Sequence, residues 1–326
     1  MPLHKNLDPE LSEAAEQLQT LFGSLNMSHL SLEQIPAMRH ALHQAAAAAA
    51  ATAAIPEVTV EEEWIPGPQD APQLRLKIYR PKQQEGVLPC FYHIHGGGMI
   101  LGDIEMEDGQ MRTFADQLNA VVTNVEYRLA PEHPHPAPVE DCYAGLQWVA
   151  AHAEALRIDP THIVVGGESA GGGLSAATVL LARDRGGPSI RFQYLIYPML
   201  DDRNETLSSQ QFHGNWPGWP REMNLLGWQA LLGDRVGGPD VSPYAAPARA
   251  TDLSNLPPAY LEVGTLEVFR DEDIAYAWRM MQQDVAVELH VNAGTFHAWE
   301  LGAPNARVTQ RAVARRMDVL QRALWG

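Results

Sequence analysis

A serine between glycines, near the middle of the chain, has the setting of an activated nucleophile. Residues 167–171 (Gly-Glu-Ser-Ala-Gly) fit the pattern G-x-S-x-G, with Ser169 at the centre, and the β-branched run at 163–165 precedes them. A strand that turns sharply into a helix lifts the serine hydroxyl clear of the sheet, and glycines let the two backbones pass closely. A glycine-rich turn without chemistry would have the same composition. The rest of the chain therefore has to supply the partners of a nucleophile.

His297 is the best-placed base for this serine. A serine hydroxyl is a weak nucleophile at neutral pH and needs a base. Of the 13 histidines, His297 is the one that directly follows the predicted last strand, 285–291, whereas His290 lies within that strand. Reactive groups of an open parallel sheet gather at the carboxyl ends of its strands, where Ser169 also lies. We therefore predict that His297 accepts the proton of Ser169.

The acid that orients this histidine is expected after the predicted strand 259–263. Four acidic residues compete there, and Glu267 lies closest to the strand end. Residues 271–273 (Asp-Glu-Asp) are expected to begin the next helix, where negative charge suits the N-terminal dipole. A carboxylate beside the imidazole fixes its tautomer and stabilises the imidazolium. Glu267 is the predicted acid.

A second glycine-rich loop, residues 95–98 (His-Gly-Gly-Gly), follows the predicted buried strand 87–94. Its exposed backbone N–H groups, with that of Ala170, are suited to hold a developing oxyanion. A phosphate site is not predicted, because no G-x-x-x-x-G-K-[ST] pattern occurs. No metal site is predicted either, because no H-E-x-x-H pattern accompanies His93 and His95.

The composition argues against several classes of function. The formal net charge of -17 disfavours binding to nucleic acid or to anionic membranes, since both need basic patches. The two cysteines, Cys90 and Cys142, exclude a disulfide framework. No run of about 20 apolar residues is present, and the N-terminus lacks the apolar segment of a signal peptide. We therefore expect a cytoplasmic protein that binds neither nucleic acid nor membrane and uses no cofactor.

Apolar periodicity predicts two N-terminal helices, a hairpin, and then alternating strands and helices. Asp8 and Ser31 are the expected N-caps of the two helices, and residues 67–70 are the expected loop of an antiparallel hairpin. Further strands are predicted at 87–94, 120–125, 163–165, 192–197, 259–263 and 285–291, and helices around 111–118, 144–156, 170–183, 274–282 and 309–324. This alternation predicts a mostly parallel central sheet with helices on both faces.

One block interrupts the alternation. Residues 201–257 lie between two predicted core strands and contain no predicted core strand themselves. They are rich in glycine, proline and large apolar residues, including Phe212, Trp216 and Trp219. A connection of this length inside a compact domain is usually a lid or an insertion. We predict a helical cap whose aromatic underside helps to form a pocket.

Taken together, these motifs resemble those of the hormone-sensitive-lipase-like family of α/β-hydrolase esterases, over roughly residues 55–325. The loop 95–98 is similar to the family's oxyanion motif, residues 167–172 are similar to its nucleophile motif, and Ser169, Glu267 and His297 follow its order. Further similar segments are 127–132, Pro138, Asp141, 159–160 and 242–245. Three positions differ from the family: Glu168 and Glu267 stand where it usually has aspartate, and Ala298 stands where it often has glycine.

The resemblance implies an α/β-hydrolase fold in which residues 1–54 and 201–250 form the cap, and 55–200 and 251–326 form the core. It also implies a dimer through the last strand, and oxyanion contacts from Gly97, Gly98 and Ala170. We expect Arg128 and Asp141 to form a buried ion pair without a chemical role. Substrate contacts are expected from His95, Gly96, Glu168, Phe212, Trp216 and Trp219.

The sequence therefore predicts a serine carboxylesterase that hydrolyses small-molecule esters with short-to-medium acyl chains. Ser169, Glu267 and His297 are its expected triad, and the reaction passes through an acyl-enzyme. An amidase or peptidase would use the same residues. A non-catalytic small-molecule receptor could share the fold, although an intact triad argues against it.

Overall fold

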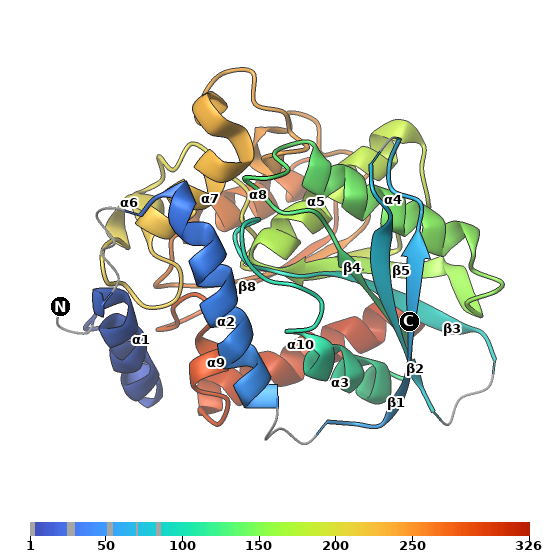
Figure 1. Ribbon diagram of the computed structural model, residues 1–326, viewed down its shortest axis with the longest axis horizontal. Helices are drawn as coiled ribbons and strands as arrows, with labels where there is room; N and C mark the ends of the chain where they lie inside the picture. Colours follow the sequence, from blue (N-terminus) through green and yellow to red (C-terminus); the bar gives the residue numbers. More distant parts are fainter. Residues whose placement is uncertain (1–3, 25–29, 51–54, 70, 83–85) are drawn as a thin grey trace.

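The computed structural model describes residues 4–24, 30–50, 55–69, 71–82 and 86–326. Within these ranges, eight strands form one sheet in the order β1-β2-β4-β3-β5-β6-β7-β8 (Figure 1). The strands are β1 (Val58–Ile65), β2 (Leu74–Pro81), β3 (Leu88–Ile94), β4 (Val121–Glu126), β5 (Ile158–Glu168), β6 (Phe192–Ile196), β7 (Ala259–Gly264) and β8 (Val287–Asn292).

The sheet is mixed, with its antiparallel part at one edge. β1 pairs antiparallel with β2, and β2 pairs antiparallel with β4. From β4 to β8 all pairs are parallel. The predicted hairpin is confirmed, because Ile65 pairs with Leu74 across its loop. The last residue of that predicted loop, Asp70, lies outside the described residues.

Helices cover both faces of the sheet, as predicted (Figure 1). The α-helices are α1 (Ser12–Ser24), α2 (Ile35–Ala50), α3 (Asp108–Leu118), α4 (Ala137–Ala151), α5 (Ala170–Arg185), α6 (Leu207–Gln211), α7 (Arg221–Leu232), α8 (Arg270–Met281), α9 (Trp299–Gly302) and α10 (Arg307–Trp325). The 3-10 helices are η1 (Pro9–Leu11), η3 (Leu32–Gln34), η4 (Gly233–Arg235) and η5 (Pro247–Arg249). Helices α4, α5 and α8 bury apolar residues on one face of the sheet, and α3 and α10 do so on the other.

The central strand β3 shows how the sheet divides the core. All of its residues are buried, as expected for a strand that is covered on both faces. Cys90, Tyr92 and Ile94 belong to the apolar cluster under α4 and α5, whereas Phe91 belongs to the cluster under α3 and α10. This alternation places His93 on the same face as Phe91. A polar side chain therefore enters the core on the α3 side of the sheet.

The N-terminal helices pack onto the domain at its two clusters. Asp8 accepts a hydrogen bond from the N–H of Glu10 (2.9 Å), and the helix that follows buries Leu11 in the α3-side cluster. The second predicted N-cap also forms, because the side chain of Gln34 accepts a hydrogen bond from the N–H of Ser31 (2.8 Å). Both predicted starts are thus confirmed. The end of the predicted alanine-rich helix, beyond residue 50, lies outside the described residues.

Three predicted boundaries were wrong by several residues. Helix α4 begins at Ala137 rather than near 144, since proline is accommodated in the first turn of a helix. Strand β5 covers Ile158–Glu168 rather than 163–165, because Ile158 pairs with Leu88 before a register shift. Helix α8 begins at Arg270 rather than near 274, but its first turn contains the three acids at 271–273, which confirms that they begin this helix.

The chain between β6 and β7 is fully described and forms helices, turns and loops but no strand. It carries α6 and α7, in agreement with the predicted helical insertion. The exact cap and core boundaries stay a prediction. None of the helices in the described part of the chain is long and apolar enough to cross a membrane. The cytoplasmic location and the dimer also stay predictions.

Candidate active site

Ser169 sits in a strained turn between β5 and α5. Its backbone has φ 57° and ψ -121°, a region that costs about 1–3 kcal/mol for a residue with a side chain. A Cβ atom at Gly171 would collide with the carbonyl oxygen of Ile94, so helix α5 passes the end of the neighbouring strand β3 only because this residue is glycine. The observed geometry is the predicted strand–turn–helix with the serine at its apex.

The structure brings Ser169, His297 and Glu267 together in one hydrogen-bonded series. His297 Nε2 lies 3.0 Å from Ser169 Oγ, and His297 Nδ1 lies 2.6 Å from Glu267 Oε2. Glu267 is completely shielded from solvent, and its other oxygen accepts a hydrogen bond from the N–H of Gly264. A buried carboxylate with both oxygens occupied by donors has a fixed orientation. The imidazole therefore faces the serine with its Nε2 atom.

Hydrogen bonds between two strand-end loops hold the acid and the histidine in place. Glu267 follows β7, and His297 follows β8. The N–H of Thr265 donates to the carbonyl of Asn292, and the N–H of Leu266 donates to the carbonyl of Thr295, both at 2.9 Å. The two side chains are thus positioned by backbone contacts on either side of them.

The other acids that follow β7 have different partners. Asp271 accepts a hydrogen bond from the N–H of Ser208 (2.7 Å), and Glu272 accepts one from the N–H of Leu200 (2.8 Å). Asp273 is fully buried on α8. Of the four candidates, Glu267 is the one whose hydrogen bond reaches His297.

Three aromatic rings surround the imidazole of His297. The ring centroids of Tyr197 and Phe269 lie 4.4 and 5.1 Å away in edge-on arrangements, and that of Trp219 lies 6.5 Å away. Such packing restricts the ring to one orientation. Tyr197 directly follows β6, and a search of strand ends could have found it. Phe269 lies two residues after Glu267 and carried no separate signal.

The glycine loop presents free N–H groups beside the serine. Gly97 and Gly98 have φ of 115° and 61°, which favour glycine. A Cβ atom at Gly98 would collide with the indole of Trp219, so the cap rests directly on this loop. Among the described residues, the N–H groups of Gly97, Gly98 and Ala170 donate to no protein acceptor. They are available to a ligand oxygen.

The remaining predicted contact residues have protein neighbours. His95 is buried and stacks on Tyr127 with ring centroids 4.1 Å apart, and burial lowers its pKa to about 4. The indole N–H of Trp216 donates to the carbonyl of Leu266 (2.9 Å), and Phe212 packs on Trp216. These aromatic side chains brace the loop before Glu267. Their contact with substrate, and that of Gly96 and Glu168, stays a prediction.

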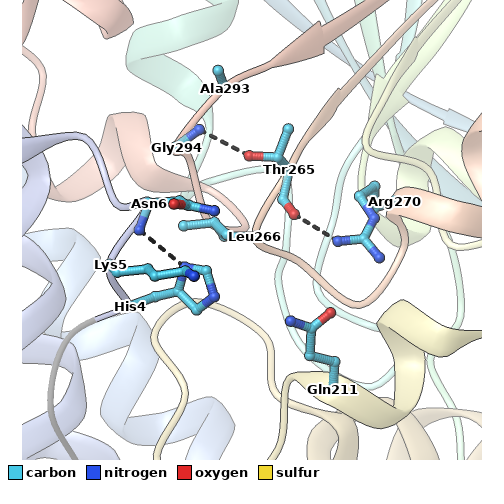
Figure 2. Close-up of a pocket in the computed structure, with 9 residues that line it drawn as sticks. All are labelled: His4, Lys5, Asn6, Gln211, Thr265, Leu266, Arg270, Ala293 and Gly294. Atoms are coloured by element: carbon cyan, nitrogen blue, oxygen red, sulfur yellow. Dashed lines mark hydrogen bonds between the residues drawn. The ribbon is translucent and has the colours of Figure 1, made fainter.

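A cavity of about 460 Å³ adjoins these loops (Figure 2). It is lined by His4, Lys5, Asn6, Gln211, Thr265, Leu266, Arg270, Ala293 and Gly294. Figure 2 shows the N–H of Gly294 donating to the Thr265 hydroxyl (2.8 Å), which joins the two loops. Neither Ser169 nor His297 lines this cavity. It lies between the two loops that carry Glu267 and His297 and the N-terminal residues 4–6.

The chain is similar in sequence and in fold to known proteins. A family profile described as alpha/beta hydrolase fold matches residues 91–301. The chain is 36% identical over 278 residues to carboxylesterase NlhH of Mycobacterium tuberculosis, which covers 83% of this chain and 84% of that protein. It is 31% identical over 234 residues to ethyl acetate hydrolase of Pseudomonas putida, which covers 70% of this chain and 72% of that protein. Among solved structures, a bacterial heroin esterase superposes with a TM-score of 0.91 at 42% identity, covering 98% of this chain and 99% of that chain.

The chain belongs to the hormone-sensitive-lipase-like family of α/β-hydrolases. It is a carboxylesterase of the serine hydrolase class. The fold predicted from its motifs is confirmed.

The structure shows the local surroundings of two residues that the sequence comparison with the family singled out, Ala298 and Asp141. Ala298, where the family often has glycine, adopts φ 54° and ψ 35°, a left-handed conformation that costs about 1–2 kcal/mol for a residue with a Cβ atom. Asp141 is fully buried and pairs with Arg128 at 2.6 Å, so the predicted ion pair is confirmed. Asp141 accepts hydrogen bonds from the N–H and from the side chain of Arg128, and these contacts fix the chain after β4.

Proposed function

We propose that Ser169, His297 and Glu267 are the catalytic triad of this carboxylesterase. The observation that carries the proposal is the series of contacts from Ser169 Oγ to His297 Nε2 (3.0 Å) and from His297 Nδ1 to Glu267 Oε2 (2.6 Å). Both distances lie within the reach needed for proton transfer and for orientation of the base. The left-handed turn at Ser169 supports the assignment, because strain of this kind is typical of functional residues.

The proposed reaction has two stages. Ser169 Oγ attacks the ester carbonyl carbon while His297 Nε2 accepts the hydroxyl proton, and the carbonyl oxygen becomes an oxyanion. The N–H groups of Gly97, Gly98 and Ala170 bind this oxygen, and each contributes about 3 kcal/mol to lowering the barrier. The ester C–O bond then breaks, and the alcohol leaves with the proton held by His297. Water attacks the acyl-enzyme in the same manner and releases the acid and free Ser169.

Short-to-medium acyl chains are the proposed substrates. The indole of Trp219 contacts Gly98 and lies near His297, so the cap occupies space directly above the reacting atoms. Additional buried aromatic residues, Phe212 and Trp216, fill the cap interior behind it. The relative from Pseudomonas putida is named for ethyl acetate, a small ester, which supports the same size class here.

The test is turnover of a chromogenic acetate ester by the wild-type protein and by Ser169→Ala, His297→Ala and Glu267→Gln. All three variants are expected to lose most activity, with the serine variant at the background rate. Unchanged turnover by Ser169→Ala would overturn the proposal. A matched chromogenic acetamide, assayed beside the ester, is expected to react far more slowly. Faster hydrolysis of the amide would reassign the protein to amide substrates.

A further inference from the structure

A buried cluster of one histidine and two glutamates lies directly beneath the nucleophile turn. His93 of β3 is completely shielded, and its Nε2 atom lies 2.7 Å from Oε2 of Glu168, the residue before Ser169. On the other side of the ring, Nδ1 lies 3.3 Å from Oε2 of Glu107, the residue before α3. Neither glutamate is far from water, because 14% of the Glu168 side chain and 20% of the Glu107 side chain are exposed.

The contacts of the His93 ring identify its charge state. Each ring nitrogen faces a carboxylate oxygen, and a carboxylate can only accept. Asn124 of β4 presents its side-chain oxygen to Nδ1 at 3.4 Å while its amide donates to Glu107 (3.3 Å). When both glutamates are ionised, both ring nitrogens carry hydrogen and every contact of the cluster is satisfied. In that state His93 is an imidazolium between two carboxylates.

The cluster connects the two backbone segments that the proposed reaction uses. Glu168 directly precedes Ser169, and its other oxygen accepts a hydrogen bond from Gln110 of α3 (3.3 Å). Glu107 accepts a hydrogen bond from the N–H of Gly96 (3.4 Å), the residue before the two proposed oxyanion donors of the glycine loop. Glu168 and Gly96 also touch, because a Cβ atom on Gly96 would lie 3.0 Å from the carbonyl oxygen of Glu168. A shift of His93 would move the nucleophile and the loop relative to each other.

We propose that His93 is a positioning residue of this carboxylesterase, whose imidazolium pairs with Glu168 and Glu107 and fixes the nucleophile turn against the oxyanion loop. The inference rests on the proposed roles of Ser169 and of the loop. It also gives a reason for glutamate at position 168. In the pairing of β3 with β5, His93 lies opposite Gly166. Glu168 lies two residues further along β5, so its side chain must extend back along the strand to reach the His93 ring. A glutamate side chain is longer than an aspartate side chain by one methylene.

The charged state of His93 has a defined pH limit. Burial alone would lower its pKa, but the carboxylates of Glu168 and Glu107 outweigh burial and raise the pKa to about 9. These two glutamates and His95 of the same strand are the titratable groups that act on it, while Asn124 of β4 and the rings of Phe91 and Phe114 complete its surroundings. Above that pH the ion pairs are lost. Burial raises the pKa of Glu107 to about 7, so both ion pairs are present between about pH 7 and pH 9, and both disappear in more alkaline solution.

The first experiment measures kcat and KM of the full-length protein and its variants for a neutral chromogenic acetate ester between pH 6 and pH 10. His93→Gln is expected to lower kcat at pH 7 by about 10- to 100-fold, with KM changed by less than about twofold, because misplaced reacting groups slow the chemical step. Wild-type kcat is expected to fall above about pH 9, and we call this falling part of the plot of kcat against pH the alkaline limb. The His93→Gln variant is expected to lack it. His290→Gln is the matched control, because His290 lies on the edge strand β8, away from the cluster, and this variant is expected to keep both the wild-type kcat and the fall of kcat above about pH 9.

Glu168→Gln provides a second, independent readout. Removal of one carboxylate lowers the pKa of His93, so the alkaline limb moves to lower pH without vanishing. The double variant His93→Gln with Glu168→Gln is expected to lose no more activity than the worse single variant, since the two side chains act as one unit. If His93→Gln does not fold, as judged by circular dichroism, Glu168→Gln provides the test: a shift of the alkaline limb to lower pH supports the inference, and an unchanged limb overturns it.

The result that overturns the inference is a folded His93→Gln variant with wild-type kcat and an unchanged alkaline limb. Additive losses in the double variant would overturn it as well. Ser169→Ala, assayed in the same series, separates this inference from the proposed function. If Ser169→Ala is inactive and His93→Gln is normal, only the positioning role fails. If Ser169→Ala remains active, the proposed triad itself fails.

Discussion

Glu267 Oε2 lies 2.6 Å from His297 Nδ1, and both side chains are buried beneath the cap. The carboxylate is further fixed by the N–H of Gly264. Since solvent cannot replace either contact, the tautomer of His297 depends on the charge and the length of this one side chain. The relationship makes Glu267 the position where the proposed triad is easiest to probe.

Glu267→Gln is predicted to lower kcat by about 10³- to 10⁴-fold with little change in KM. The amide can donate to Nδ1, which leaves the proton on Nε2, where it blocks acceptance from Ser169. Steady-state kinetics with a chromogenic acetate ester measure the effect. Glu267→Asp keeps the charge but draws it back by one bond, so it should retain more activity than the glutamine variant. Higher activity in Glu267→Gln than in Glu267→Asp would contradict the assignment.

Gly98→Ala is predicted to lower kcat by about 10²- to 10³-fold, the size of effect expected when one oxyanion donor is displaced. The new methyl would meet the indole of Trp219, and the loop would have to move away from Ser169. Gly186→Ala is the matched control, because Gly186 has a similar φ of 60° but open space around its Cα atom. Equal activity of the two variants would show that the loop position is unimportant.

Ala298→Gly is predicted to raise the free energy of unfolding by about 1 kcal/mol, because glycine relieves the left-handed strain that alanine carries. Urea unfolding followed by circular dichroism measures the change. Ala314→Gly is the control, since Ala314 is an exposed residue within α10, where glycine should lower the free energy of unfolding by about 1 kcal/mol. The same sign in both variants would exclude strain at Ala298 as the cause.

The stabilisation that His93 provides is predicted to depend on pH. Its pKa is raised above the ordinary value of about 6.5, so its contribution is lost as the pH rises through about 9. The difference in unfolding free energy between the wild type and His93→Gln should therefore shrink between pH 8 and pH 10. Urea unfolding at each pH tests this, and His290→Gln should show no such trend. A difference that grows with pH would contradict a charged His93.

Much of the fold and of the site was predictable because the signals are local or tied to strand ends. The G-x-S-x-G motif defines its own turn, and parallel strands bring Ser169, Glu267 and His297 to the same edge of the sheet. The His93 cluster was not predictable. Glu107 follows a long loop after β3, and no spacing in the sequence indicates that its side chain returns to the strand. Contacts of this kind depend on tertiary packing alone.

The boundaries that sequence patterns missed have related causes. The first half of β5 is half-exposed, so its apolar signal begins only where both faces are covered, at Ile163. The start of α4 was hidden by the prolines at 136 and 138, which are compatible with a first helical turn but are also typical of loops.

The central claim is that Ser169 carries the acyl group, and covalent labelling tests it most directly. The protein is incubated with an activated phosphonate ester, a reagent that traps serine nucleophiles, and is then digested and analysed by mass spectrometry. The account predicts one modification per chain, located on Ser169, which His297→Ala slows and Ser169→Ala abolishes. Labelling of another residue, or undiminished labelling of Ser169→Ala, would contradict it.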